Sequence, residues 1–402
     1  MTIATPPRPH IWPIVALALA TRSLTLLFVA THFPHTWLYT RGIELGTLAQ
    51  SLVEGHGLSS PFGGSTGPTA LLAPGYPAVI SVCFRIFGSF TFQAAVAVML
   101  LQLIFSVVTV LLIVQVANRC FGPRAANVAG VFWAVSLPLL WMPTIFWETC
   151  LSTLLLLGMV ALSLHVAEKP RIILWPAMGV YCGLAALVNP ALLLTLLALL
   201  GWVAWQTREK FQLSLLLALL MCALVYAPWP IRNARALGAF IPLRSTVAFE
   251  LWMGNHPGAT GFLDESLFPI FNRGEFDQYV TLGEVAYMRR KSTLAQEYIR
   301  AHAGEFLRLS TIRFVRYWSG TGIQHGSVIF AIHAVLTTFG AIIGLGRLWQ
   351  KRSVSLAVLF LLPLLFFPLP YYITHAEFRY RLVVDPLLTI LAAHGLSASR
   401  AG

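Results

Sequence analysis

The chain has 402 residues, of which 57% are hydrophobic and 10% are charged, whereas an ordinary soluble domain is about one-quarter charged. This composition excludes a soluble globular protein and indicates an integral membrane protein. The net charge of +12 does not indicate nucleic acid, because basic residues flank apolar runs, where membrane orientation and lipid headgroups account for them. Since no nucleic-acid-binding motif accompanies the charge, we expect membrane lipid, and no nucleic acid, among the partners.

The first apolar run, from Ile11 to about Thr31, is long enough to cross a bilayer. No cleavage-site pattern follows it, so we predict a retained span. Arg22 lies inside this run, where an arginine must find a carboxylate, a phosphate or a water-lined cavity, and it is a candidate site residue for that reason. The alternative is that backbone carbonyls satisfy Arg22 or that it reaches the membrane surface.

Further spans are predicted over residues 92–116, 126–140, 149–166, 172–187, 191–205, 213–226, 327–348, 353–371 and 382–393. With the first, they give an all-α polytopic membrane protein of about ten transmembrane helices. Several of the runs are short enough for tilted or broken helices.

The short loops between these runs set the orientation. Basic residues fall on one side of the membrane: Arg119, Arg124, Lys169, Arg171, Arg208, Lys210, Arg347, Lys351 and Arg352. The opposite short loops, 141–147 and 188–190, contain no lysine or arginine. The positive-inside rule makes the basic side cytoplasmic, so we expect both termini in the cytoplasm and two large loops, 32–91 and 228–326, outside.

Both large loops are expected to carry juxtamembrane helices. The first contains a predicted helix over 44–54 and an apolar stretch over 74–88, which is too short to span and is predicted to lie at the interface. The second ends in a predicted amphipathic helix from Leu294 to Trp318, in which apolar residues recur at helical spacing between arginines. We treat 1–402 as one domain with N-terminal spans in 1–227, the outer loop 228–326 and C-terminal spans in 327–402.

Polar residues at the outer ends of the apolar runs fall in four places: Glu44, Trp147-Glu148, Arg232-Asn233 and the segment from His375 to Arg381. A carboxylate with several arginines suits a reaction on an anionic, lipid-borne substrate, because arginine binds phosphate oxygens bidentately and a carboxylate takes a proton from an incoming hydroxyl. The last segment is the most specific, since four ionisable residues packed between two spans are costly without a function.

The other three places also have structural explanations. Glu44 and Glu148 each stand at the start of a predicted helix, where a carboxylate stabilises the helix dipole. Arg232 and Asn233 follow a Pro-Trp-Pro segment that must end a helix, and they also suit an interfacial anchor. The sequence has no Walker-type phosphate loop, His-Glu-x-x-His or Gly-x-Ser-x-Gly, which argues against nucleotide hydrolysis, zinc proteolysis and serine hydrolysis.

A set of short motifs runs along nearly the whole chain. It comprises Glu44, Leu48-Ala49, Leu52, Gly55-x-Gly57, Pro61, Pro68-Thr-Ala70, Pro74-Gly-Tyr-Pro77, Phe87-Gly88, Phe121-Gly122-Pro-Arg124, Asn189-Pro190, Pro228-Trp229, Arg232-Asn233, Leu251-Trp-x-Gly254-Asn255, His375-x-Glu377-x-Arg379-Tyr380-Arg381 and Pro386. Together these motifs resemble the GT-C superfamily of membrane glycosyltransferases, in the branch of dolichyl-phosphate-mannose–protein mannosyltransferases and aminoarabinose-transferase-like enzymes. The resemblance implies a GT-C-like fold whose first outer loop forms the active site beside a cavity that opens to the membrane.

The resemblance also implies an inverting glycosyltransferase that moves a sugar from a polyprenyl-phosphate donor to an acceptor hydroxyl, with an acidic first-loop residue as base. The family commonly has Asp at the position of Arg41, and the nearest acid in this chain is Glu44, about one helical turn further on. We therefore expect Glu44 as the base and Glu148 as a second acid that positions the base or the acceptor.

The remaining candidate residues divide between donor phosphate and sugar. The phosphate ligands expected are Arg232, Arg379, Arg381, Arg244 and Arg22, and the residues expected to position sugar or acceptor are His375, Glu377, Asn255, His56 and Tyr76. A phosphate leaving group lessens the need for a general acid, because arginines stabilise its developing charge. No cofactor is expected; a divalent metal stays open, since two well-separated carboxylates give it little support.

We therefore predict a hexosyl or pentosyl transferase on the outer, periplasmic face of a bacterial-type inner membrane, with a polyprenyl-phosphate-linked donor and a protein, lipid or glycan acceptor. A transporter or flippase for a lipid-linked or anionic solute is one alternative; it predicts matched halves with broken, charged helices, which the sequence does not show. A catalytically inactive scaffold of the same fold is the other, and Arg41 keeps it open.

Overall fold

The computed structural model describes residues 9–33, 39–40, 42–207, 212–321 and 327–397. Within these ranges every regular element is a helix, and an isolated β-bridge joins Ser59 to Pro68 in the first outer loop. The predicted all-α class is confirmed. Arg41, where the sequence departs from the family pattern, lies outside the described residues.

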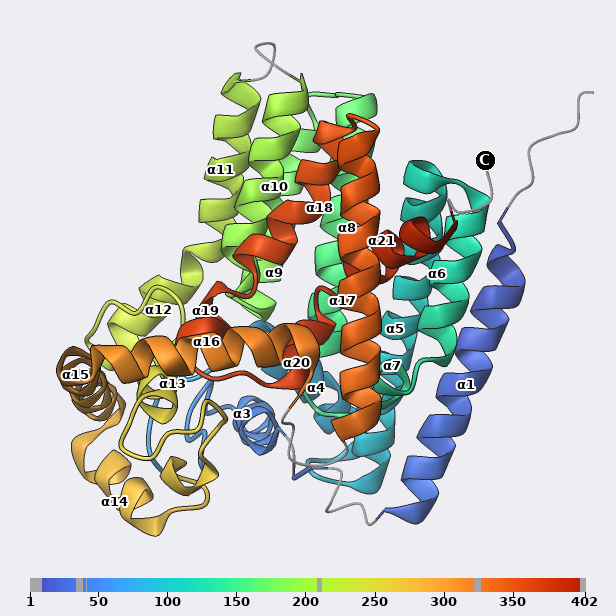
Figure 1. The fold of residues 1–402 in the computed structure, drawn as a ribbon. Helices are drawn as coiled ribbons and strands as arrows, with labels where there is room; N and C mark the ends of the chain where they lie inside the picture. Colours follow the sequence, from blue (N-terminus) through green and yellow to red (C-terminus); the bar gives the residue numbers. More distant parts are fainter. Residues whose placement is uncertain (1–8, 34–38, 41, 208–211, 322–326, 398–402) are drawn as a thin grey trace, which may run out of the picture.

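The long apolar helices stand side by side and form most of the molecule (Figure 1). They are α1 (Ile11–His32), α5 (Phe92–Phe121), α6 (Pro123–Val135), α8 (Thr149–Glu168), α9 (Leu174–Val188), α10 (Leu192–Thr207), α11 (Gln212–Tyr226), α17 (Ser327–Gln350), α18 (Val354–Phe366) and α21 (Asp385–Ser397). The short helix α7 (Leu137–Trp141) follows α6. Each predicted span therefore contains a helix. Apolar residues cover nearly all sides of these helices, which is the pattern of segments surrounded by lipid and by other apolar helices.

The number of spans is smaller by length than the sequence predicts. Among the described helices, six are long and apolar enough to cross a membrane, or seven if α6 and α7, which meet at a bend of 60°, form one span with the 3-10 turn that follows. The bend lies at Ser136, which has extended backbone angles, just before Pro138 removes a helical donor. α9 and α10 are apolar but shorter, so the count of about ten stays a prediction.

Glycines bring several of these helices into close contact, as is common between membrane helices. A Cβ atom on Gly179 of α9 would overlap the carbonyl oxygen of Ala218 on α11. A Cβ atom on Gly344 of α17 would likewise overlap the carbonyl oxygen of Leu391 on α21. No side chain fits at either position, so these two glycines set the distance between the paired helices.

The two outer loops form a second layer at one end of the long helices (Figure 1). This layer contains α3 (Ile43–Val53), α4 (Gly75–Phe87), α12 (Pro228–Leu237), α13 (Thr246–Gly254), α14 (Arg273–Leu282), α15 (Glu284–Ala301), α16 (Ala303–Ser319), α19 (Leu369–Ile373) and α20 (Phe378–Leu382). The helices predicted over 44–54 and 74–88 are confirmed as α3 and α4.

Hydrogen bonds fasten the first loop to the second. The buried carboxylate of Glu284, at the start of α15, accepts hydrogen bonds from the Thr69 hydroxyl, and from the Ala70 N–H and the Tyr279 hydroxyl at 2.8 Å each. Arg232 of α12 donates to the carbonyl oxygens of Thr69 and Leu58, at 2.5 and 2.7 Å. The loop that follows α3 is therefore held in place by side chains from the other outer segment.

The single amphipathic helix predicted from Leu294 to Trp318 is wrong, because the chain breaks at His302 into α15 and α16. His302 has φ −130° and ψ 49°, outside the helical region. Gly304, a poor helix former, follows two residues later. α16 lies across the direction of the long helices (Figure 1) and exposes Leu307 and Phe314.

Candidate active site

Glu44 lies in the first turn of α3, with 7% of its surface exposed. The residue before the helix, Gly42, has φ +92°, and a Cβ atom there would overlap the carbonyl oxygen of Phe146. Glycine thus lets the start of α3 press against the segment that carries Trp147 and Glu148. Burial raises the pKa of the Glu44 carboxyl to about 7, because the loss of hydration outweighs the opposite effects of a backbone N–H and of Arg379.

Arg379 of α20 lies against the same segment. Its guanidinium carbon is 3.9 Å from the centre of the Trp147 ring and 4.6 Å from that of the Tyr380 ring, and the guanidinium forms an ion pair with Glu377. Burial by itself lowers the pKa of Arg379, but Glu377, Tyr380 and Glu148 reverse this to a net rise. Arg379 is therefore a permanent cation that rests on aromatic rings.

Arg244 and Glu250 form a second ion pair in the same region, with 3.3 Å between nitrogen and oxygen. Burial lowers the pKa of Arg244, but Glu250, with further contributions from Tyr371 and Glu148, raises it overall. The ring of Tyr371 stacks on that of Tyr380, with 4.1 Å between the ring centres. This stack connects the two arginine–carboxylate pairs.

His375 completes the cluster. Its Nε2 atom lies 2.8 Å from the Tyr380 hydroxyl and 4.0 Å from the Glu377 carboxylate, and 3% of the residue is exposed. Burial lowers the pKa of His375, so the imidazole is neutral at pH 7. Its Nδ1 atom has no hydrogen-bond partner within the described part of the chain, and an imidazole nitrogen in that position is available to a ligand.

The structure thus gathers six predicted site residues into one cluster between the outer layer and the long helices: Glu44, Glu148, Arg244, His375, Glu377 and Arg379. Glu250, Tyr371 and Tyr380 also belong to the cluster and were missed as site residues. Glu250 had a signal in the sequence, because it is the single acid in the otherwise apolar run 246–254. The two tyrosines flank His375 closely, but the sequence cannot tell a site tyrosine from one at the interface.

Three other predicted phosphate ligands have protein partners outside this cluster. Arg22 is 1% exposed and donates to the Ser106 hydroxyl at 2.7 Å and to carbonyl oxygens of Ala18, Trp133 and Ala134. Arg232 holds the first loop, as described above. Arg381 is fully buried against Asp385. For Arg22 this matches the carbonyl-satisfied alternative, and the contacts of all three arginines favour structural roles.

The last three predicted positioning residues are also scattered. Asn255 is buried and donates to the carbonyl oxygens of Leu251 and Ile373 at 2.8 Å each. His56 is exposed beside Glu54. Tyr76 is 1% exposed, and its hydroxyl has no hydrogen-bond partner among the described residues. The contacts of Asn255 are structural, whereas the roles predicted for His56 and Tyr76 stay predictions.

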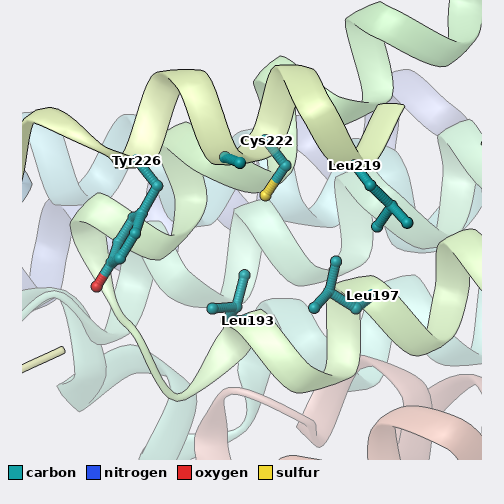
Figure 2. Close-up of a pocket in the computed structure, with 6 residues that line it drawn as sticks. Leu193, Leu197, Leu219, Cys222 and Tyr226 are labelled. Atoms are coloured by element: carbon teal, nitrogen blue, oxygen red, sulfur yellow. The ribbon is translucent and has the colours of Figure 1, made fainter. Parts of the chain in front are cut away.

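A pocket of about 230 Å³ lies between α10 and α11, and none of its lining residues belongs to the cluster around Glu44. It is lined by Leu193, Leu197, Leu219, Cys222, Ala223 and Tyr226. Figure 2 shows the leucines and the thiol pointing into an apolar space. The pocket lining contains no charged side chain. No group of three or more metal-ligating side chains occurs in the ranges that the structure describes.

Comparison with known sequences agrees with the motifs. The profile of the dolichyl-phosphate-mannose-protein mannosyltransferase family matches residues 72–231, which include the end of the first loop, α4 to α11 and the start of α12. A search of curated proteins found no match.

Comparison with solved structures of an archaeal oligosaccharyltransferase supports the fold. The oligosaccharyltransferase of Archaeoglobus fulgidus in its apo form superposes with a TM-score of 0.55 at 14% identity, over 95% of this chain and 50% of the other. The archaeal oligosaccharyltransferase AglB, also from Archaeoglobus fulgidus, in complex with an inhibitory peptide and a dolichol-phosphate gives a TM-score of 0.53 at 13% identity, over 96% of this chain and 50% of the other. ArnT from Cupriavidus metallidurans bound to undecaprenyl phosphate gives 0.43 at 13% identity, over 95% and 77%.

The chain therefore has the fold of the GT-C membrane glycosyltransferases, and the resemblance drawn from the motifs is confirmed. It spans about half the length of the archaeal oligosaccharyltransferase. At this low identity the likeness establishes the architecture alone.

Proposed function

We propose that this protein is an inverting membrane glycosyltransferase that moves a sugar from a polyprenyl-phosphate donor to an acceptor hydroxyl. The observation that carries the proposal is the site itself, in which the buried Glu44 carboxyl has a pKa near 7 and lies within the electrostatic reach of Arg379. A general base works best with a pKa close to the working pH. A permanent cation close enough to lower the pKa of that carboxyl suits a phosphate leaving group in the same site.

In the proposed reaction, the acceptor hydroxyl gives its proton to the ionised Glu44 carboxylate as its oxygen attacks the anomeric carbon. The bond between that carbon and the phosphate oxygen breaks, and the electron pair leaves with the polyprenyl phosphate. Arg379 and Arg244 stabilise the charge on the departing phosphate. Because attack and departure take place on opposite faces of the sugar, a single displacement inverts the anomeric centre.

The neighbours of Glu44 have supporting roles in this scheme. Glu148 raises the pKa of Glu44, so it keeps the base from becoming too weak, and it orients the acceptor. His375, which is neutral, hydrogen-bonds a sugar hydroxyl, and the Glu377 carboxylate accepts a hydrogen bond from another. Glu377 and Glu250 each pair with one arginine, and the incoming phosphate takes over part of that pairing.

The proposed donor class has support from the structural comparison. The archaeal enzyme of similar fold has been solved with a dolichol-phosphate, and the family matched by residues 72–231 is described by a dolichyl-phosphate sugar donor. We assign the whole chain to one transferase unit in the bacterial inner membrane, with the site on the periplasmic face. The acceptor belongs to the class of hydroxyl-bearing proteins, lipids or glycans.

The test is sugar transfer by the purified protein in lipid nanodiscs from a panel of radiolabelled polyprenyl-phosphate sugars. We expect wild type to consume one donor and Glu44→Gln to do so at least about a hundredfold more slowly, the range of a lost general base. Glu54→Gln, which changes an exposed acid just after the same helix, is the matched control and should leave the rate unchanged.

The other outcomes are informative as well. If a donor binds to wild type but is not consumed, the inactive-scaffold interpretation replaces the enzyme. If the labelled lipid crosses the bilayer without a change in its sugar linkage, the protein is a flippase. If Glu44→Gln and Glu54→Gln have the same rate as wild type, Glu44 is not the base.

A further inference from the structure

A buried network of ionisable side chains, which the transfer reaction does not use, lies on the side of α20 that faces α17. Arg381 forms an ion pair with Asp385, and both side chains are completely buried. The second guanidinium nitrogen of Arg381 donates to the Thr337 hydroxyl at 2.6 Å, the Thr338 hydroxyl at 3.0 Å and the carbonyl oxygen of Ala334 at 3.0 Å, all on α17. One arginine thus fastens α20 to α17.

His333 extends this network across the helices. Its Nε2 atom lies 2.9 Å from the second oxygen of Asp385. Because a carboxylate only accepts, Nε2 carries a proton and donates. The other ring nitrogen lies 2.7 Å from the Ser136 hydroxyl, at the bend between α6 and α7. The network therefore runs from α20 through α21 and α17 to that bend.

The network contacts α17 within Val328–Gln350, a stretch long and apolar enough to cross a membrane, where charge is unfavourable. His333 is about 9 Å, and Thr338 about 17 Å, along α17 from its first residue, at 1.5 Å per residue. A charged side chain inside a membrane segment costs several kcal/mol and is retained mostly where it has a task. A buried ion pair gives little net stability compared with an apolar pair of the same volume. Stability alone is therefore a weak reason for Arg381, Asp385 and His333 to occur here.

The geometry of α20 indicates the role of this network. Two residues apart on a helix correspond to about 200°, so Arg379 and Arg381 point to nearly opposite sides of α20. Arg379 is on the side of Trp147 and Glu377, and Arg381 is on the side of α17. With five residues, α20 makes few hydrogen bonds of its own. The position of α20 therefore depends on the contacts that Arg381 makes with α17.

We propose that the network of Arg381, Asp385 and His333 positions Arg379 for the donor phosphate by fixing the orientation of α20. Arg381 is then a positioning residue and not a phosphate ligand. Loss of the Asp385 charge leaves the buried Arg381 cation without its counter-ion, so Arg381 moves away from α17, and α20 turns or tilts so that Arg379 leaves Trp147. The proposal rests on the function proposed above only in naming phosphate as the ligand of Arg379.

The first measurement needs no ligand. The positive charge of Arg379 lowers the pKa of Glu44, so displacement of Arg379 raises that pKa. We would follow the ionisation of Glu44 by infrared difference spectroscopy, with Glu44→Gln as the reference, in wild type, Arg379→Gln and Asp385→Asn. We expect the Glu44 pKa to rise in both variants, and to rise no further when they are combined.

The second measurement is equilibrium binding of undecaprenyl phosphate to the protein in nanodiscs. Arg379→Gln should weaken binding about tenfold or more, the range for a hydrogen bond to a charged group. Asp385→Asn should weaken it at least about fivefold, and should have no further effect in the Arg379→Gln background, because interacting residues are non-additive. The double replacement Arg381→Met with Asp385→Leu serves if the single variant does not fold, since it leaves no unpaired buried charge.

A matched control separates positioning from general stability. Lys291, which is buried, and Glu275, which is partly buried, form another ion pair, with 2.7 Å between nitrogen and oxygen, in the second outer loop. Glu275→Gln should lower the unfolding temperature without a change in the Glu44 pKa or in phosphate affinity. If Asp385→Asn behaves like Glu275→Gln in both readouts, the network is merely structural and the proposal is wrong. If wild type does not bind undecaprenyl phosphate, the proposed donor class fails, while the Glu44 pKa still decides the positioning role.

Discussion

Glu44 has its unusual acidity because of where the chain puts it. Its position in the first turn of α3 would by itself favour the ionised carboxylate, through the helix dipole. Burial and the neighbouring carboxylates of Glu377 and Glu148 act in the opposite direction and dominate, which gives a pKa of about 7. Glu44 can therefore stabilise the start of α3 and also meet the pKa requirement for a general base.

This pKa predicts the pH dependence of transfer. The base acts when ionised, so the rate should rise as pH increases through about 7 and level off above it. The residual rate of Glu44→Gln should lack this inflection. Steady-state rates between pH 5 and 9 with a fixed donor check the prediction, and an inflection that persists in the variant would assign it to another group.

The stability of the protein should follow the opposite trend. The folded-state pKa of Glu44 is raised from 4.5 to about 7, so the folded protein holds this proton more tightly than the unfolded chain does. The contribution is complete below pH 4.5 and is lost as pH rises from 4.5 to about 7, and it amounts to about 3 kcal/mol. Glu44→Gln should remove this pH-dependent part of the unfolding temperature.

Residue types could be predicted from the sequence, but side-chain directions could not. Glu44, His375 and Arg379 were found because ionisable residues at the ends of apolar runs are rare. Arg381, two residues from Arg379, had the same signal, yet it points to α17 and pairs with Asp385. Which side of a one-turn helix faces the site depends on tertiary contacts, and Asp385 was hidden at the start of an apolar run.

At the scale of elements, glycines decide which helices pair closely. Gly179→Ala should force α9 and α11 apart, because the added Cβ atom overlaps the Ala218 carbonyl oxygen. We expect a loss of about 1–3 kcal/mol, typical of overpacking. Gly201→Ala on α10 is the control, since a Cβ atom there meets nothing within 4 Å. Thermal unfolding in detergent measures both, and equal unfolding temperatures for the two variants would refute the role of Gly179.

Elements were easier to predict than their contacts. Long apolar runs give helices reliably, and α3 begins within a residue of its predicted start. The break at His302 between α15 and α16 was not predicted, because apolar residues recur at helical spacing on both sides of it. The pairing of α17 with α21 was not predictable either, since helices that are apolar all round do not indicate which face meets a neighbour.

At the scale of the whole molecule, the distribution of basic residues predicts the orientation in the membrane. Thr281 of α14 and Arg171 before α9 are both exposed. The predicted topology puts Thr281 outside and Arg171 in the cytoplasm. In a variant without the five native cysteines, Thr281→Cys should react with a membrane-impermeant maleimide added to intact cells. Arg171→Cys should react only after the membrane is opened. The reverse pattern would place the site on the cytoplasmic side.

The crowding of four carboxyl groups, Glu44, Glu148, Glu250 and Glu377, around two arginines has a consequence for proton exchange. An anionic donor that docks beside Glu44 adds negative charge, so it raises the pKa of that carboxyl further, and the site takes up a proton from solution as the donor binds. By thermodynamic reciprocity, donor affinity falls as the solution becomes more alkaline. The maximal velocity at saturating donor then inflects at a higher pH than the velocity at low donor, because the first reports the occupied site and the second the empty one.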